Sequence, residues 1–212
     1  MTDFIKVFSH NSIMINTESG AVYIDPFKLN DSPKDAAFIL VTHDHYDHFS
    51  PEDIAKVANS NTILVVPEKM AKKANEAAGL VKEIVTVKQT DLKDVSGLKI
   101  ETVPAYNTLK PFHTKNAGWV GYILEVKGQR IYIAGDTDAT KEAREVKCDI
   151  ALVPVGGTYT MDAKKAAELI NEMQPKVAIP VHYGSIVGSA KDADKFVSLV
   201  NPPVQVEIKI GK

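Results

Sequence analysis

The heptapeptide Thr42-His43-Asp44-His45-Tyr46-Asp47-His48 holds three of the chain's six histidines and two aspartates. The apolar run at residues 36–41 leads into it, and a short run unbroken by polar residues predicts a buried strand. Ser50 and Pro51 follow as helix-start signals, an N-cap and a first helical residue. The cluster is therefore expected on the loop after the C-terminal end of a strand, where α/β proteins collect ligand groups.

These residue types indicate metal binding. Neutral imidazole nitrogens and carboxylate oxygens are the usual ligands of zinc, manganese and iron. In an extended chain the side chains of His43 and His45 point the same way and can share one metal. Asp47 and His48 come after a turn and can hold a second metal nearby. The alternative is a solvated polar loop, but groups packed this densely after a core strand need some partner.

Composition sets broad limits on the protein class. The chain has 212 residues, 44% of them hydrophobic and 25% charged, and a formal net charge of -2. This predicts one domain over residues 1–212 and gives no electrostatic sign of nucleic-acid binding. No secretory core is expected at residues 1–8, and no apolar run approaches the length of a membrane span. We expect a cytoplasmic protein, with its single cysteine, Cys148, as a small buried filler.

The order of the predicted elements is mixed. Strands are predicted at residues 4–8, 13–15, 21–24, 36–41, 62–66, 84–87, 98–103, 119–126, 130–134, 150–155, 177–181 and 204–210, with a turn at 94–97. Helices are predicted at residues 51–59, 67–78, about 141–147, 163–173 and 190–199. Strands alternate with helices, while hairpin-like strands recur. Neither a purely parallel sheet nor a purely β fold matches this pattern.

Other strands also end at ligand-type residues. Asp136 follows the strand at 130–134, after Gly135, and His182 follows the strand at 177–181. Asp25 ends the strand at 21–24, and His10 lies in a turn. Read alone, each has a plainer interpretation. Asp136 would belong to a Gly-Asp turn, and Asp25 would be a turn residue. His182 and His10 would be structural histidines, the first in the core and the second in a turn.

The motif His-x-His-x-Asp-His after a buried strand resembles the signature of the metallo-β-lactamase superfamily. The resemblance covers residues 25–182 and implies a four-layer αβ/βα sandwich, with metals at one edge between two sheets. The His10 turn, Ile24-Asp25-Pro26 and Ala134-Gly135-Asp136-Thr137 look like the small stand-alone hydrolases similar to the ascorbate-6-phosphate lactonase.

The resemblance also implies roles for individual residues. It places His43 and His45 at one metal, and Asp47, His48 and His182 at the other. Asp136 would bridge the two metals, and Asp25 would orient a ligand histidine, as ligand imidazoles require.

One position departs from the family pattern. The position after Ala105-Tyr106, where the family has a metal-binding histidine, is Asn107. His113, six residues on, is the expected replacement; otherwise Asn107, water or nothing fills that place, and His113 is a surface residue of the loop at 104–119.

The expected chemistry is hydrolysis of an ester, lactone, amide or phosphoester of a small molecule. Two divalent ions, zinc in the first place and manganese or iron as alternatives, would supply hydroxide, with Asp47 and Asp136 holding them. The sequence does not choose between water and Tyr183 as the leaving-group acid. Lys110 and Lys115 are the only basic residues near Asn107 and His113, so no phosphate pocket is indicated.

Three alternatives remain at this stage, and the oligomeric state is open. The departure at Asn107 allows a metal-binding protein with little catalysis. Iron redox chemistry, as in flavodiiron relatives, is disfavoured because no flavin domain is present. A nuclease is disfavoured by the acidic charge balance and by the lack of an extra domain.

Overall fold

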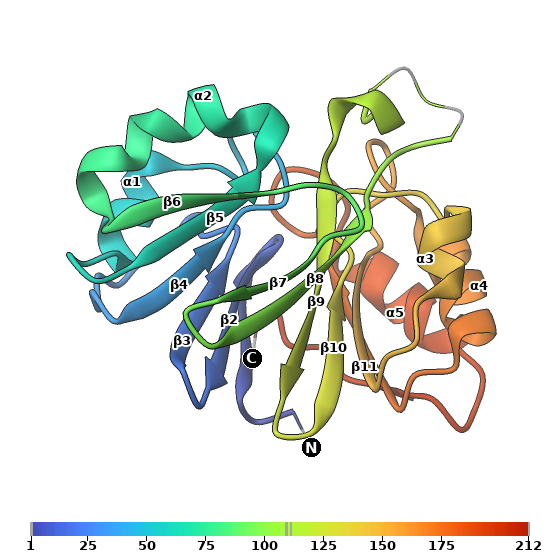
Figure 1. The fold of residues 1–212 in the computed structure, drawn as a ribbon. Coiled ribbons are helices and arrows are strands. Elements are labelled where there is room, and N and C mark those ends of the chain that lie inside the picture. Colours follow the sequence, from blue (N-terminus) through green and yellow to red (C-terminus); the bar gives the residue numbers. More distant parts are fainter. Residues whose placement is uncertain (1, 109, 111, 212) are drawn as a thin grey trace.

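The strands of the chain form two sheets that face each other (Figure 1). The computed structural model describes residues 2–108, 110 and 112–211, so the two ends of the predicted domain, residues 1 and 212, lie outside the described residues. The six-stranded sheet runs in the order β1-β2-β3-β4-β5-β6, and the seven-stranded sheet runs β13-β12-β11-β10-β9-β8-β7.

The first sheet consists of β1 (Ile5–Ser9), β2 (Ser12–Thr17), β3 (Gly20–Ile24), β4 (Ala36–Leu40), β5 (Ile63–Pro67) and β6 (Glu83–Val87). The second sheet consists of β7 (Leu92–Val95), β8 (Leu98–Pro104), β9 (Val120–Val126), β10 (Gln129–Ile133), β11 (Ile150–Pro154), β12 (Val177–Val181) and β13 (Gln205–Val206). Both sheets are mixed: β3 to β6 are parallel, and so are β10 to β13, while hairpins form the remainder.

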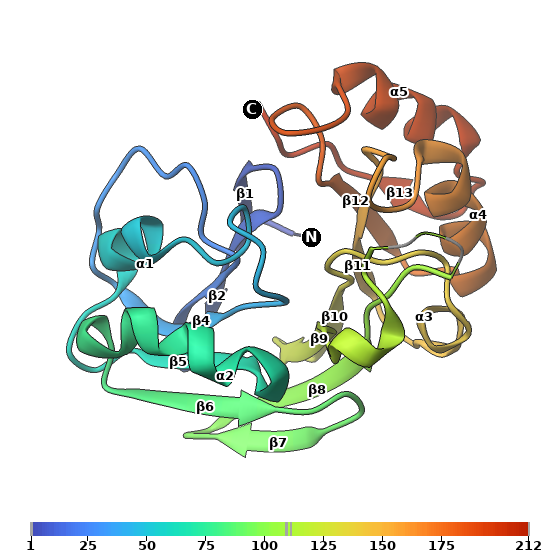
Figure 2. The same ribbon diagram turned by 90° about the horizontal axis from the view of Figure 1, so that it is seen from above.

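Helices cover the two outer faces, as Figure 2 shows from above. The first sheet carries α1 (Pro51–Val57) and α2 (Ala71–Ala74) with the 3-10 helices η1 (Glu68–Met70) and η2 (Asn75–Leu80). The second sheet carries α3 (Lys141–Glu145), α4 (Ala163–Met173) and α5 (Ala190–Leu199), and η3 (Lys115–Ala117) lies in the loop after β8. The predicted four-layer αβ/βα sandwich is confirmed.

Side-chain alternation explains why the layers stay together. On β10, Ile131 and Ile133 point into the core between the sheets, while Tyr132 packs on the other face among residues of α3 and α4. Successive side chains of a strand point to opposite faces, so a strand that is apolar throughout has both faces buried. The central strands are of this kind, which is why they appear in the sequence as unbroken apolar runs.

Three local predictions were wrong. The helix predicted at residues 67–78 is one α-helical turn between two 3-10 helices, in a segment with the weak helix formers Asn75 and Gly79. The predicted turn at 94–97 is narrower, because β7 pairs with β8 around Ser96 and Gly97, both at positive φ. The last strand is Gln205–Val206 only, since this edge segment pairs with β12 alone.

Hydrogen bonds tie the two sheets together at one edge. The amide of Val120 donates to the carbonyl of Thr42 (3.2 Å), and the hydroxyl of Tyr122 donates to the carbonyl of Val41 (2.7 Å). The amide of His182 donates to the carbonyl of His10 (2.8 Å). The ends of β4 and β12, the start of β9 and the β1–β2 turn therefore meet at this edge. No helix in the described part of the chain is long and apolar enough to cross a bilayer.

Candidate metal centre

Two groups of ligand-type side chains lie at this edge. His43, His45 and His113 form what we call the histidine group, with one nitrogen of each within 4.8 Å of the others. His10, Asp47, His48 and His182 form the carboxylate group by the same measure. Six of these seven residues are buried; His45 is partly exposed. The sequence predicts the same two groups for all of these residues except His10, which it places outside both groups.

Asp136 lies between the two groups. Its Oδ1 is 3.0 Å from Nε2 of His182 and 3.3 Å from Nε2 of His48. Its Oδ2 is 3.8 Å from Nε2 of His43 and 3.7 Å from Nδ1 of His113. Each oxygen of one carboxylate thus faces a different group, an arrangement suited to bridging two cations.

The backbone brings Asp136 to this place by a close turn after β10. Gly135 has φ +64°, and a Cβ atom there would lie 3.1 Å from Cβ of Thr42. Glycine adopts this conformation without the steric cost that a side chain would add.

Several buried ring and carboxylate atoms at the centre have no hydrogen-bond partner. They include Nε2 of His48, Nδ1 of His113, Nε2 of His182 and Oδ1 of Asp136. The last two atoms are 3.0 Å apart but lack the alignment of a hydrogen bond. An unpaired buried polar atom costs about 1–3 kcal/mol, and these atoms converge on the same spaces. Divalent cations would satisfy them together, so the donor set fits metal ions.

Asp25 fixes the orientation of His48. Its carboxylate accepts hydrogen bonds from Nδ1 of His48 (2.7 Å), from Nδ2 of Asn11 (2.7 Å) and from the amide of Thr42 (2.8 Å). The Thr42 hydroxyl also donates to Asp25 and lies 3.0 Å from Nδ1 of His43. The outer nitrogens of both histidines are thereby occupied, and their Nε2 atoms face Asp136. Thr42 and Asn11 were not singled out from the sequence.

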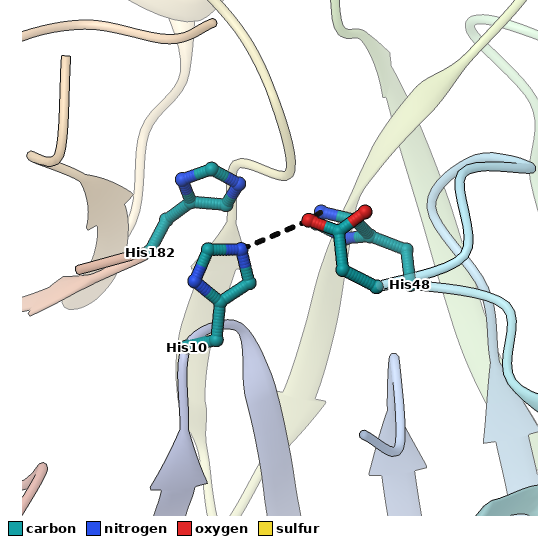
Figure 3. A group of neighbouring side chains, drawn as sticks. His10, His48 and His182 are labelled. Atoms are coloured by element: carbon teal, nitrogen blue, oxygen red, sulfur yellow. Dashed lines mark hydrogen bonds and ion pairs between the residues drawn. The ribbon is translucent and has the colours of Figure 1, made fainter. Parts of the chain in front are cut away.

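His10 approaches the carboxylate group from the β1–β2 turn (Figure 3). Its Nε2 is 3.0 Å from Oδ2 of Asp47, the contact drawn as a dashed line, and its ring centre is 3.8 Å from that of His182. Burial lowers the pKa of His10, so the ring is neutral at pH 7 and its single N–H faces the Asp47 carboxylate. His10 thus holds Asp47 and packs against His182.

Four of these residues have an unusual backbone conformation. His10, Asp25, His113 and His182 have φ of 52°, 45°, 61° and 58°, in the left-handed region. Such residues cost roughly 1–3 kcal/mol each and cluster at functional sites. The strain agrees with a centre whose side chains are placed for binding rather than for stability.

The charge states differ between the groups. Burial lowers the pKa of His48, but the carboxylates around it, Asp136 first, outweigh burial and raise the pKa to about 9. Burial lowers the pKa of His43 far below its ordinary value and also lowers the pKa of His113. Burial raises the pKa of Asp47, but its hydrogen-bonded histidine neighbour outweighs this, and the pKa falls to about 2. At pH 7, His43, His113 and Asp47 are therefore in the forms that bind cations.

Comparison with known proteins identifies the family. A family profile described as "Beta-lactamase superfamily domain" matches residues 4–182. The chain belongs to this superfamily. The prediction made from the His-x-His-x-Asp-His motif is thereby confirmed.

Relatives from the superfamily agree over nearly the whole chain. A UPF0173 metal-dependent hydrolase of Pyrococcus abyssi is 30% identical over 96% of this chain and 95% of its own length. A UPF0173 metal-dependent hydrolase of Thermococcus onnurineus is 31% identical over 90% of this chain and 89% of its own length. The crystal structure of a protein from Parabacteroides distasonis, described as a metal-dependent hydrolase, has a TM-score of 0.77 at 30% identity and covers 97% of this chain and 92% of that chain. These relatives confirm the predicted enzyme class, metal-dependent hydrolase. The assignment to the lactonase-like branch stays a prediction.

The loop between β8 and β9 carries the departure from the superfamily pattern. Nδ2 of Asn107 donates to the carbonyls of Tyr159 (2.7 Å) and Phe112 (3.2 Å), and its Oδ1 is buried without a hydrogen-bond partner. Its backbone amide donates to the carbonyl of His113 (2.6 Å). Asn107 thus shapes the loop, and the ring of His113 joins the histidine group instead.

A second anchor of this loop was not predicted. The Asp138 carboxylate accepts hydrogen bonds from the amide of Thr108 (3.0 Å) and from Nζ of Lys110 (3.2 Å). The segment after β10 therefore supplies Asp136 to the centre and Asp138 to the loop. Trp119, at the end of the loop, packs its ring 4.7–5.0 Å from the rings of the histidine group. The sequence signal for Asp138 was its place in Gly-Asp-Thr-Asp, two residues after Asp136.

The structure does not bring the side chain of the candidate Tyr183 to the centre. Its ring packs in the core between the second sheet and its helices, and its hydroxyl is buried there without a partner. Burial and the charge of Asp194 raise its pKa. The neighbour of His182 in sequence therefore points into the outer core layer.

Proposed function

We propose that the chain is a hydrolase with a binuclear metal centre that cleaves an ester, lactone or phosphoester of a small molecule. The single observation that carries this proposal is the position of Asp136. Its two carboxylate oxygens face the two groups separately, as a bridging ligand must. The relatives described as metal-dependent hydrolases support the same class.

The roles of the residues follow from their contacts. His43, His45 and His113 would hold one cation, and Asp47, His48 and His182 the other, with Asp136 bound to both. Zinc is the first expectation for this donor set, with manganese or iron as alternatives. When bound, the cations would lower the pKa of a coordinated water toward about 7 and polarise the bond under attack.

The surrounding residues would keep the ligands in place. Asp25 holds Nδ1 of His48, and Thr42 lies beside Nδ1 of His43. His10 holds Oδ2 of Asp47. Such supporting contacts are worth roughly 10–100-fold in metal affinity or activity, because they fix both the tautomer and the direction of each ligand.

The proposal is tested by metal content and turnover together. Native protein should contain about two metals per chain by mass spectrometry and hydrolyse p-nitrophenyl esters or bis(p-nitrophenyl) phosphate, and a chelator should abolish the turnover. In Asp136→Ala, metal content should fall and activity should drop at least ~10³-fold, since several kcal/mol of charge stabilisation are lost. Asp31→Ala, at an exposed position, is the matched control. Undiminished metal and activity in Asp136→Ala would refute the binuclear centre.

A further inference from the structure

A cavity of about 360 Å³ opens onto the metal centre. Part of its lining belongs to the centre itself: His45, Asp47, His113 and Asp136. Small-molecule sites typically measure roughly 300–1,000 Å³, so the cavity has room for a compact substrate. Its position beside both groups makes it the place where the rest of the substrate would lie.

The remaining wall is aromatic and aliphatic. It consists of Tyr46, Phe112, Tyr159 and Ile186. The rings of Phe112 and Tyr159 meet edge to face at 5.4 Å, and the ring of Tyr159 is nearly parallel to that of His113. Tyr46, Phe112 and Tyr159 remain 62%, 41% and 40% exposed. Large apolar side chains left exposed together beside a cavity mark a ligand-binding surface.

Positive side chains are missing from this wall. Among the lining residues that the structure describes, none is lysine or arginine. The two lysines of the neighbouring loop are engaged elsewhere: Lys110 pairs with Asp138 and Lys115 with Glu142. An anionic group placed against the apolar wall, away from the metal ligands, would lose its hydration without gaining a cationic side chain of that wall as a partner, which is costly.

We propose that the cavity binds the flat, apolar and uncharged part of a neutral carboxylic ester or lactone, and that Phe112 and Tyr159 select it. This inference rests on the proposed hydrolase function for the reacting end of the substrate. It narrows the proposed substrates from esters, lactones and phosphoesters to carboxylic esters, of which lactones are the cyclic form. A phosphorylated or carboxylated side group is selected against, because the cavity offers it rings where it needs cations.

Binding and turnover are measured on two matched pairs of compounds. The first pair are ethers that cannot be hydrolysed, 2-phenyltetrahydrofuran and tetrahydrofuran-2-carboxylate, titrated into the protein as purified and followed by NMR. The second pair are γ-phenyl- and γ-carboxy-γ-butyrolactone, followed by proton release. We expect the phenyl compound to be preferred about tenfold or more in each pair, as burial of one aromatic ring implies.

Variants assign the preference to the wall. Tyr159→Ala should remove most of the preference for the phenyl ether, Tyr159→Phe should restore it, and Leu92→Ala, on a distant exposed strand, should change nothing. Equal or tighter binding of the carboxylate ether, or a preference unchanged in Tyr159→Ala, would overturn the proposal. Selective ether binding without lactone turnover would leave the cavity assignment standing and refute the proposed reaction instead.

Discussion

The histidine group and the carboxylate group lie on either side of Asp136, but they rest on different kinds of structure. In the carboxylate group, His182 directly follows β12, and buried hydrogen bonds hold His48 to Asp25 and Asp47 to His10. In the histidine group, His113 comes from a long loop shaped by Asn107. Two members of the histidine group, His45 and His113, line the cavity, whereas the carboxylate group lines it through Asp47 alone.

This difference suggests that the two groups bind their metals with different affinities. A group fixed by strand ends and buried carboxylates loses little entropy when it binds a cation, because its ligands are already ordered. A group that depends on a loop must order that loop and is open to solvent and substrate. We therefore expect the carboxylate group to bind its metal more tightly and the histidine group to exchange its metal more readily.

Removal of one ligand from each group gives the largest expected effect. His113→Ala should leave one tightly bound metal per chain, whereas His182→Ala should weaken the tighter site. Each loss should exceed the roughly 10–100-fold that a supporting residue contributes, because a direct ligand is removed. Metal titration against a competing chelator measures both affinities. Two metals bound with native affinity by His113→Ala would show that His113 is not a metal ligand.

The difference between strand-end residues and loop residues also separates what the sequence predicted from what it did not. Asp136 and His182 could be identified because each follows a buried apolar strand, and parallel strands of one sheet end at the same edge. The pairing of the two sheets follows from the same apolar runs. These features are encoded locally, in periodicity and in strand-end residues.

The loop and the outer contacts are not encoded in this way. His113 reaches the centre only because Asn107 and Asp138 fold the loop back, through hydrogen bonds to carbonyls and amides far away in sequence. Nothing in the local pattern around Asn107 or Thr42 specifies such partners. Tyr183 shows the converse: it adjoins His182 in sequence, yet its side chain packs on the opposite side of the chain.

His10 offers the next test, because it supports only the carboxylate group. His10→Ala should lower metal affinity at that group by roughly 10–100-fold and leave the histidine group unchanged. His10→Gln keeps a side-chain N–H that can donate to Asp47, so it should recover part of the affinity. A site weakened equally by both substitutions would mean that the ring itself binds the metal, and an unchanged site would mean that His10 only packs against His182.

The charge states predict a difference in proton release. His48, with its pKa raised to about 9, carries a proton at pH 7 and must lose it to bind a cation through Nε2. Affinity at the carboxylate group should therefore fall about tenfold per pH unit as the pH falls below that pKa. His43 and His113, whose pKa values are lowered by burial, should release no proton when they bind a cation at pH 7.

Calorimetric metal titration at pH 7 in two buffers of different ionisation enthalpy counts these protons. About one proton should accompany filling of the tighter site. Asp25→Asn should reduce that number, since it removes one of the carboxylates that raise the pKa of His48. Proton release confined to the weaker site would reverse the assignment of the two groups.

The smallest effect is expected where the loop is held from outside the centre. Asn107→Ala removes the two hydrogen bonds from Nδ2 to the carbonyls of Tyr159 and Phe112, so His113 should be placed less accurately. Metal affinity at the histidine group should fall about tenfold, the lower end of the range for supporting residues, while the carboxylate group keeps its affinity. Asn61→Ala, at an exposed asparagine, is the control. If Asn107→Ala instead weakened the carboxylate group, or neither group, the loop would not set the difference between the two sites.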